Sequence, residues 1–412
     1  MKRLLAMITC ALLAFSTGCS RSNESSGSST IKNEKVSLKL WGSQEDQGML
    51  TGMVDSFKKA HPDKTYDITL GVVSEADAKS EVLKDVAVAG DVFCFAGDQI
   101  AELKNAGALY RVTKNKDAVI SNNTPASIAA CTIDNELYAY PSSSDTYFMY
   151  YDKSKFTEDE VKSVEKMLAK DLGANVKNFV YNIDDGWYNA GFFFANGCTL
   201  FGKDGLDPKS CDFNSANGVA VGKYLVDLVK NPRFADYKDD GQLLTNVQSG
   251  TYAAVVTGTW NSEAIKGYLG ANYAATKLPT IMIDGKEKQL SSMANFKLYG
   301  VNSQTKHPSD ALALAEFLTS KECQKIRFDK RSFAPTNKDL AADEAALSSN
   351  IAVSALANQS QFATLQASIP QMGKYWEPAE AFGAGIIDGT VTKENMQQKL
   401  DALVQATLAT IS

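Results

Sequence analysis

The chain has 412 residues, of which 44% are hydrophobic and 22% charged, and its formal net charge is −6 at pH 7. These values are ordinary for a soluble globular protein. The negative balance argues against nucleic acid as a partner, because phosphate binding needs a clustered basic face. A leader and a linker leave roughly 375 residues, more than one hydrophobic core usually holds, so we expect two domains.

Residues 1–19 have the pattern of a bacterial export signal. Lys2 and Arg3 precede an apolar run at 4–15, too short to span a bilayer, which needs about 20 apolar residues. Small residues then lead to Cys19. A cysteine in this place is the bacterial lipoprotein pattern, in which the thiol is acylated and becomes the new N-terminus. An ordinary signal peptide cleaved nearby is the alternative, and either one exports the protein.

Residues 20–35 are rich in Ser, Asn and Gly. Such a segment buries too little apolar surface to order itself and behaves as a flexible tether. We therefore expect a globular body held near the outer face of the cytoplasmic membrane by lipid alone.

The cysteines after Cys19 do not form a disulfide framework. Their number is odd, their spacing is scattered and no CxxC pair occurs, so neither a metal site nor redox chemistry is predicted. Cys198 and Cys211 are close enough in sequence to pair, but buried free thiols are the alternative, and the sequence leaves this open.

Alternating strand and helix patterns predict an α/β fold with parallel sheets. The first set comprises strands at 36–41, 66–72 and 90–95 and helices at 47–60, 76–89 and 99–106. Two extended runs at 137–141 and 146–151 flank small polar residues, as in a strand that passes from one domain to another. Later segments predict helices at 216–230, 309–319, 322–329, 351–367 and 392–409, and strands at 252–256 and 298–301.

The order of these pieces resembles a known family, the extracellular solute-binding proteins of bacterial ABC importers, and within it the maltose- and maltodextrin-binding cluster. The resemblance covers 36–412. It is carried by LKLW (38–41), GDVF (90–93) ahead of AGD (96–98), YAYP (138–141), FVYN (179–182), TGTW (257–260), and IPQM (369–372) followed by Tyr375 and Trp376.

The resemblance implies a periplasmic-binding-protein-like fold, with two α/β lobes around a hinge and a ligand cleft. Carried onto this chain, lobe one would comprise 36–142 plus 296–335, and lobe two 146–292 plus 345–412. The hinge crossings would lie near 142–145, 294–297 and 336–346.

Three tryptophans are candidates for stacking on the apolar faces of a sugar. Trp260 follows a strand across Thr-Gly-Thr, at the carboxyl end where open α/β sheets bind ligands. Trp376 starts a helix and has Tyr375 beside it, and Trp187 with Tyr188 lies in an acidic loop. The resemblance assigns stacking to these rings, and ordinary packing is the alternative for each.

Carboxylates are the expected partners of sugar hydroxyls. The resemblance assigns this role to Asp185, with Asp184 next to it a helix cap or a solvated charge. On lobe one it assigns Asp98, with Phe95 as the accompanying aromatic, although Asp98 equally fits a helix cap. Asp145 follows the first crossing and is otherwise a hinge-turn residue. Glu45 and Asp46 match a charged ligand-binding pair less well, and helix N-terminal charges are the alternative.

Four positions depart from the family pattern. Asp46, Gln99 and Glu380 stand where relatives typically have basic residues, and Glu377 replaces an aromatic ring. The cleft is therefore expected to be more acidic than in maltose-binding relatives and to recognise a different chain length, linkage or end.

The resemblance implies a monomeric, lipid-anchored receptor without cofactor or metal. It would capture an oligosaccharide, chiefly an α-glucan fragment, and deliver it to an ABC permease. Another oligosaccharide, or a surface glycan-adhesion role without transport, is the alternative. Paired carboxylates also suit a glycosidase, but the resemblance to non-catalytic receptors favours binding.

Overall fold

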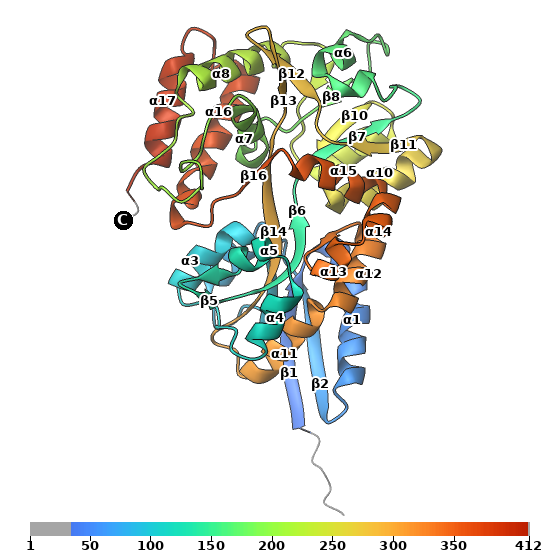
Figure 1. The fold of residues 1–412 in the computed structure, drawn as a ribbon, viewed down its shortest axis with the longest axis vertical. Coiled ribbons are helices and arrows are strands. Elements are labelled where there is room, and N and C mark those ends of the chain that lie inside the picture. The colour runs from blue at the N-terminus through green and yellow to red at the C-terminus, as the bar shows by residue number, and fades with distance from the viewer. Residues whose placement is uncertain (1–33, 411–412) are drawn as a thin grey trace, which may run out of the picture.

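Two α/β lobes, one above the other in Figure 1, make up residues 34–410, which are the residues that this computed structural model describes. We call the body around the larger sheet lobe one and the body around the smaller sheet lobe two. The export signal, Cys19 and residues 20–33 lie outside the described part. Strand β1 begins at Glu34, so the tether predicted to reach residue 35 is at least two residues shorter.

The sheet of lobe one has seven strands, and its path runs β15-β6-β14-β3-β1-β2, with β16 paired to β14. Strands β2, β1 and β3 are parallel, whereas β14 is antiparallel to both β3 and β6. The bounds are β1 Glu34–Gly42, β2 Lys64–Val72, β3 Val92–Ala96, β6 Tyr140–Asp145, β14 Ser292–Val301, β15 Ala334–Pro335 and β16 Ala363–Leu365.

Helices cover this sheet because each turns one apolar stripe toward it. Helix α1, for example, buries Leu50, Met53 and Phe57 and exposes Lys59. The helices are α1 Gln47–Ala60, α2 Ala78–Lys84, α3 Ile100–Asn105, α4 Lys116–Asn122, α5 Pro125–Ala130, α11 Pro308–Leu318 and α12 Lys321–Arg331, and a small hairpin joins β4 Thr132–Ile133 to β5 Glu136–Leu137.

Lobe two has a five-stranded sheet in the order β11-β7-β10-β8-β9, with a hydrophobic core on each face. Its strands are β7 Phe148–Asp152, β8 Phe179–Val180, β9 Phe234–Ala235, β10 Ala254–Thr257 and β11 Tyr273–Thr276, beside the hairpin β12 Thr280–Ile283 and β13 Lys286–Gln289. Its helices are α6 Val164–Ala169, α7 Gly186–Ala195, α8 Ala216–Val229, α9 Asp240–Gln248, α10 Ser262–Leu269, α14 Glu344–Ser349, α15 Ile351–Ser360, α16 Trp376–Asp388 and α17 Met396–Thr407. The short helix α13 Lys338–Ala341 instead contacts β15 of the lobe-one sheet.

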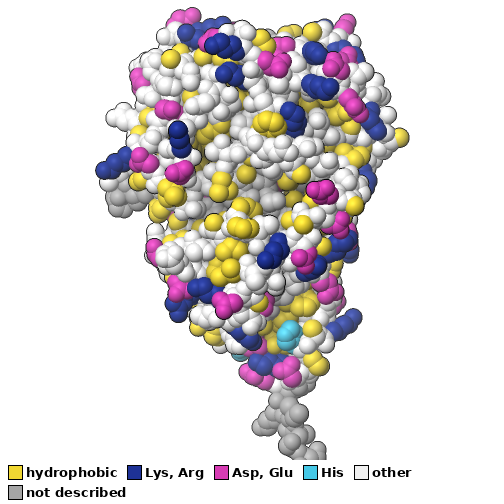
Figure 2. Space-filling view, viewed as in Figure 1, with side chains coloured by type: hydrophobic (Ala, Val, Ile, Leu, Met, Phe, Trp, Pro, Cys, Tyr) yellow, Lys and Arg dark blue, Asp and Glu magenta, His cyan; other side chains and the backbone are white. Residues whose placement is uncertain are grey.

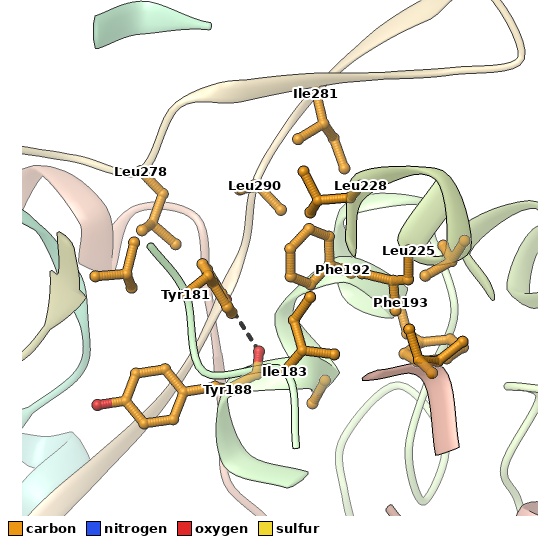
Figure 3. Close-up of a cluster of buried hydrophobic side chains, with 14 of the residues drawn as sticks. Tyr181, Ile183, Tyr188, Phe192, Phe193, Leu225, Leu228, Leu278, Ile281 and Leu290 are labelled. Carbon is orange, nitrogen blue, oxygen red and sulfur yellow. Dashed lines mark hydrogen bonds between the residues drawn. The ribbon is translucent and has the colours of Figure 1, made fainter. Parts of the chain in front are cut away.

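Aromatic rings pack among aliphatic side chains in the larger core of lobe two (Figure 3). Phe193 stacks on Phe213 with ring centroids 4.3 Å apart. The buried Tyr181 hydroxyl donates to the backbone oxygen of Tyr188 at 3.0 Å, the bond drawn in Figure 3. This bond satisfies a polar group that would otherwise destabilise an apolar core, and it fixes the start of α7.

Three segments connect the lobes. The chain passes from β6 to β7, and so from one sheet to the other, within three residues. Strand β14 runs from beside β16 into the sheet of lobe one, and Figure 1 shows it upright between the lobes. The third connection follows β15, where the buried Gln324 side chain accepts hydrogen bonds from the backbone N–H groups of Thr336 at 2.8 Å and Asn337 at 2.7 Å.

Three predicted helices are shorter in the structure by more than two residues. Helix α17 covers Met396–Thr407 instead of 392–409. Helix α2 covers Ala78–Lys84 instead of 76–89, because the chain turns before β3. Helix α15 ends at Ser360, and Ala363–Leu365 form β16, which pairs in parallel with the first residues of β14. Here a strand partner distant in sequence overrides the helical pattern.

The described residues also bear on the possible disulfide and on membrane-spanning helices. Cys198 and Cys211 are both free thiols, so the possible disulfide is not formed. Within 34–410 no helix combines the length and the apolar character that a membrane crossing requires.

Candidate functional site

Three tryptophans from distant parts of the chain lie on the same side of lobe two. Trp187 is in the first turn of α7, Trp260 follows β10, and Trp376 begins α16. The rings of Trp187 and Trp260 are 5.9 Å apart and inclined at 43°. Trp376 lies against Gly186, the residue before Trp187. All three are partly buried against the lobe-two core and keep some ring surface free.

Gly258 gives Trp260 its position. The indole folds back over this glycine so closely that a Cβ atom there would lie 1.7 Å from the ring. The hydroxyl of Tyr150 donates to the Gly258 carbonyl at 3.1 Å and holds the turn. Thr-Gly-Thr-Trp is therefore a packing motif, in which the glycine makes room for the ring.

The loop that carries Trp187 is fixed by close contact with α16. A Cβ at Gly383 would lie 2.0 Å from the carbonyl oxygen of Ile183. Asp185 is the N-cap of α7, since its carboxylate accepts from the backbone N–H of Trp187 at 2.7 Å. Of the two roles expected for Asp184, the helix cap is therefore excluded, because the cap is one residue later at Asp185, and the solvated charge is left. Burial raises the pKa of Asp185 to about 6, although the hydrogen bond from the Trp187 N–H lowers it.

Asp98 from lobe one makes a side-chain contact and does not cap a helix. Its carboxylate accepts from the Asn295 amide at 3.0 Å, and the short helices around it carry no side-chain cap. Burial raises the pKa of Asp98 to about 6, although the Asn295 hydrogen bond lowers it.

Asp145 ends β6, opposite Asn295 of β14. Its Oδ1 is buried and has no hydrogen-bond partner among the described residues. Burial raises the pKa of Asp145 to about 6, while the positive charge of Lys297 acts in the opposite direction. A buried acceptor without a partner is costly, and a donor supplied by a ligand would remove that cost.

Lys297 is a site residue that the sequence analysis missed. Its ammonium group lies 3.3 Å from Glu75 Oε1 and 5.8 Å from the centre of the Trp260 ring. Burial opposes its charge, but Glu75, Asp145 and Asp46 together raise the pKa of Lys297. The available signal was a lone charge inside the otherwise apolar stretch Phe296 to Val301.

Asp46 and Glu45 differ in their surroundings. Asp46 is 4% exposed and bonds Arg331 Nε through Oδ1 at 2.9 Å. Arg331 Nη2 also donates to the backbone oxygen of Trp260 at 3.4 Å, which joins the two lobes at this point. Glu45 is exposed.

Three predicted site aromatics lie in hydrophobic cores. Phe95 is 0% exposed and packs on Phe93, and Tyr188 stacks on Tyr147 at 4.6 Å. Tyr375 is buried too, and its hydroxyl donates to the Gly186 carbonyl at 2.9 Å. In this structure these rings offer no free face to a ligand. Tyr188 and Tyr375 were predicted as neighbours of Trp187 and Trp376, but a side chain one position away points elsewhere. Phe95 was predicted from the resemblance, which expects an aromatic ring at that position.

The site therefore combines tryptophan rings of lobe two with carboxylates of lobe one, and such a surface suits a ligand with apolar faces and many hydroxyl groups. Basic and acidic side chains are interspersed over the face in Figure 2. Within 34–410 no three His, Cys, Asp or Glu side chains come together in a way that could hold a metal ion.

A comparison with protein families gives one match that covers most of the chain. The family described as bacterial extracellular solute-binding protein matches residues 52–375. The chain belongs to this family. Its two-lobed α/β fold is confirmed. The family consists of extracellular solute-binding proteins, which confirms the extracellular location and the non-enzymatic role that were expected.

Named relatives of this solute-binding protein bind different sugars. The galactooligosaccharide-binding protein of Bacillus subtilis is 29% identical over 97% of this chain and 95% of its own. The maltooligosaccharide ABC transporter solute-binding lipoprotein of Streptococcus pneumoniae is 25% identical over 75% of this chain and 77% of its own. The solved maltodextrin-binding protein MalE1 of L. casei has 30% identity, a TM-score of 0.79 and coverage of 92% and 100%. A structure described as "with acarbose" has 36% identity, a TM-score of 0.85 and coverage of 90% and 98%.

The contact between Gly258 and Trp260 leads to a prediction for the solute-binding protein without ligand. Gly258→Ala should force the indole away from Trp187 and lower the free energy of unfolding by roughly 1–3 kcal/mol. Near-ultraviolet circular dichroism should report the loss of the tryptophan pair. Gly267→Ala, in α10 with open space around its Cα, is the control and should stabilise the protein slightly. An unchanged spectrum for Gly258→Ala would contradict the packing argument.

The buried carboxylates predict an unusual pH dependence of stability. Between pH 4 and 6 the folded chain binds more protons than the unfolded chain, because folding raises the pKa values of Asp98, Asp145 and Asp185 to about 6. The free energy of unfolding should therefore fall as the pH rises from about 4 to 7. Asp145→Asn should reduce this slope, whereas Asp55→Asn, at an exposed position of α1, should leave it unchanged. Urea titrations at several pH values measure the slope, and stability that rises with pH would contradict the argument.

Proposed function

We propose that this solute-binding protein captures oligosaccharides, chiefly α-glucan fragments, between its lobes and delivers them to the permease of an ABC importer. The single observation that carries the proposal is the pair formed by Trp187 and Trp260, 5.9 Å apart, with the Lys297 ammonium group over the Trp260 ring. Two inclined rings follow the curvature of a short glucan better than they fit a small flat ligand.

The polar groups around the rings match the edges of a sugar. Asp145 has a buried oxygen without a partner within 34–410, and Asp98 accepts a hydrogen bond from the Asn295 amide. Hydroxyl groups donate to such acceptors, and Lys297 can donate to a ring or hydroxyl oxygen. Because these groups come from lobe one and the rings from lobe two, a bound sugar favours the closed arrangement of the lobes over the open one.

The choice of α-glucan is supported by the relatives named for maltooligosaccharide and maltodextrin. A galactooligosaccharide is the second candidate, because the relative that covers 97% of the chain is named for that sugar. Both candidates present apolar sugar faces to the same tryptophans and differ in hydroxyl orientation and linkage.

We propose further that Cys19 carries a lipid and holds a monomeric receptor at the membrane. Support comes from the residue pattern before Cys19 and from the relative named a lipoprotein. A surface glycan-adhesion protein would use the same sugar site without a change in shape.

Calorimetric titration with maltotriose, β-galactotriose and glucose tests the ligand class. We expect the strongest binding for maltotriose, and Trp260→Ala should weaken it by roughly tenfold or more, as the loss of a buried aromatic contact implies. Tyr268→Ala, which removes an aromatic ring 41% exposed on the same lobe, should leave the affinity unchanged. Binding of β-galactotriose alone would replace the α-glucan by the second candidate.

Small-angle X-ray scattering tests the transport role. A receptor that closes on its ligand should show a smaller radius of gyration when saturated with maltotriose, because the two lobes approach each other. An unchanged radius with bound sugar would favour the adhesion alternative.

A further inference from the structure

A second recess adjoins the tryptophans on lobe two and is strongly acidic. It has a volume of about 500 Å³ and lies between the loop before α7 and the first turns of α16. Four carboxylates line it, with one lysine, and we call it the acidic recess. Its charged lining residues are Asp184, Asp185, Glu377, Glu380 and Lys238.

The charges in the acidic recess are not balanced by partners. None of its four carboxylates takes part in an ion pair within 34–410, and Lys238 takes part in none there either. Elsewhere on lobe two such groups do pair, as Lys170 does with Glu160. An excess of negative charge therefore faces the open space.

Asn182 gives an independent indication that the recess receives a ligand. It lines the recess, is only 7% exposed, and its Oδ1 is buried without a hydrogen-bond partner among the described residues. Buried amide oxygens almost always accept a hydrogen bond in native proteins. An amide oxygen without a partner beside a recess can therefore accept one from a ligand.

We propose that the acidic recess holds a terminal sugar that carries a positively charged amino group. The proposal rests on the oligosaccharide-binding function above and adds the chemical class of one sugar unit. A primary ammonium group has three donors and no acceptor, which complements a lining of carboxylates and one orphaned amide oxygen. A neutral sugar hydroxyl must also find donors, and here Lys238 is the only charged one.

The mutual effects of the carboxylates agree with this assignment. Burial raises the pKa of Asp185, and the nearby charges of Glu380 and Asp184 raise it further. Burial likewise raises the pKa of Glu380, with Asp184 and Glu377 acting in the same direction. A cation in the recess would relieve this repulsion. Asp236 accepts from the Ile183 N–H at 2.6 Å, and burial, with the charges of Asp184 and Asp185 acting in the same direction, raises the pKa of Asp236 to about 7.

A bare metal ion fits the recess less well than an ammonium group on a sugar. Metal ions need several ligand atoms at short distances around one point, and no such group of side chains occurs within 34–410. The carboxylates are instead spread over the walls of a space large enough for a sugar ring. The start of α16 joins the recess to Trp376, so one oligosaccharide can reach both.

Titration calorimetry with three matched sugars tests the proposal. The probes are maltotetraose, maltotetraose with a primary amine at carbon 6 of either terminal glucose, and the same amines after N-acetylation. At an ionic strength of about 0.01 M, where charges interact over about 30 Å, one amine should bind roughly five- to tenfold tighter than its acetylated form. The preference should shrink as salt is added.

Variants locate the effect. Glu377→Gln combined with Glu380→Gln removes two exposed charges and should bring the affinity ratio of amine to acetylated sugar close to one. Glu287→Gln, at an exposed position of β13 on the same lobe, should preserve the ratio. A ratio of one in the unmodified protein, or a ratio that the double variant preserves, overturns this proposal alone. Absence of binding by all of these sugars overturns the proposed function as well.

Discussion

One buried ammonium group allows the carboxylates of the site to coexist. Lys297 stands on β14 with Glu75, Asp145 and Asp46 around it, and their combined field keeps it charged despite burial. Without this cation, the desolvated acids would repel one another and would have to protonate or move apart. Because β14 also passes between the lobes, the charge lies where the two halves of the molecule meet. The same ammonium group also lies over the Trp260 ring, 5.8 Å from its centre.

Close backbone contacts hold the tryptophan rings of the site in place, just as the charge of Lys297 holds its carboxylates. Gly258 makes room for the indole of Trp260, and Gly383 lets α16 touch the carbonyl of Ile183. Through that second contact Trp376 reaches the neighbourhood of Trp187, although 189 positions separate them in sequence. Rings carried by loops would otherwise lose rotamer freedom on binding. Here the packing of glycines against rings and backbone has already restricted them, which reduces the entropic cost of capture.

The α/β class, the parallel first strands and helix α1 could be predicted from the sequence because periodicity is a local signal. The place after a strand likewise pointed to Trp260, whereas the resemblance to the family pointed to Trp187 and Trp376. The inward direction of Phe95, Tyr188 and Tyr375 could not be predicted, since adjacent residues of a loop or helix point to different sides. Lys297 and Arg331 were missed for another reason. Their partners, Glu75 and Asp46, are more than 200 residues away, and no local pattern records such a pairing.

The Asn295 amide has a consequence for how the two halves of the site respond to each other. Its Nδ2 donates to Asp98 of lobe one at 3.0 Å and to Gln366 at 2.9 Å, and Gln366 leads into the segment that carries Trp376. The Asn295 amide thus donates one hydrogen bond to the Asp98 carboxylate and another to Gln366, which precedes the segment that carries Trp376. Any ligand that draws Asp98 away alters the restraint on that segment. The energetic contributions of Asp98 and Trp376 are consequently coupled and do not add, as happens when residues share a hydrogen-bond network.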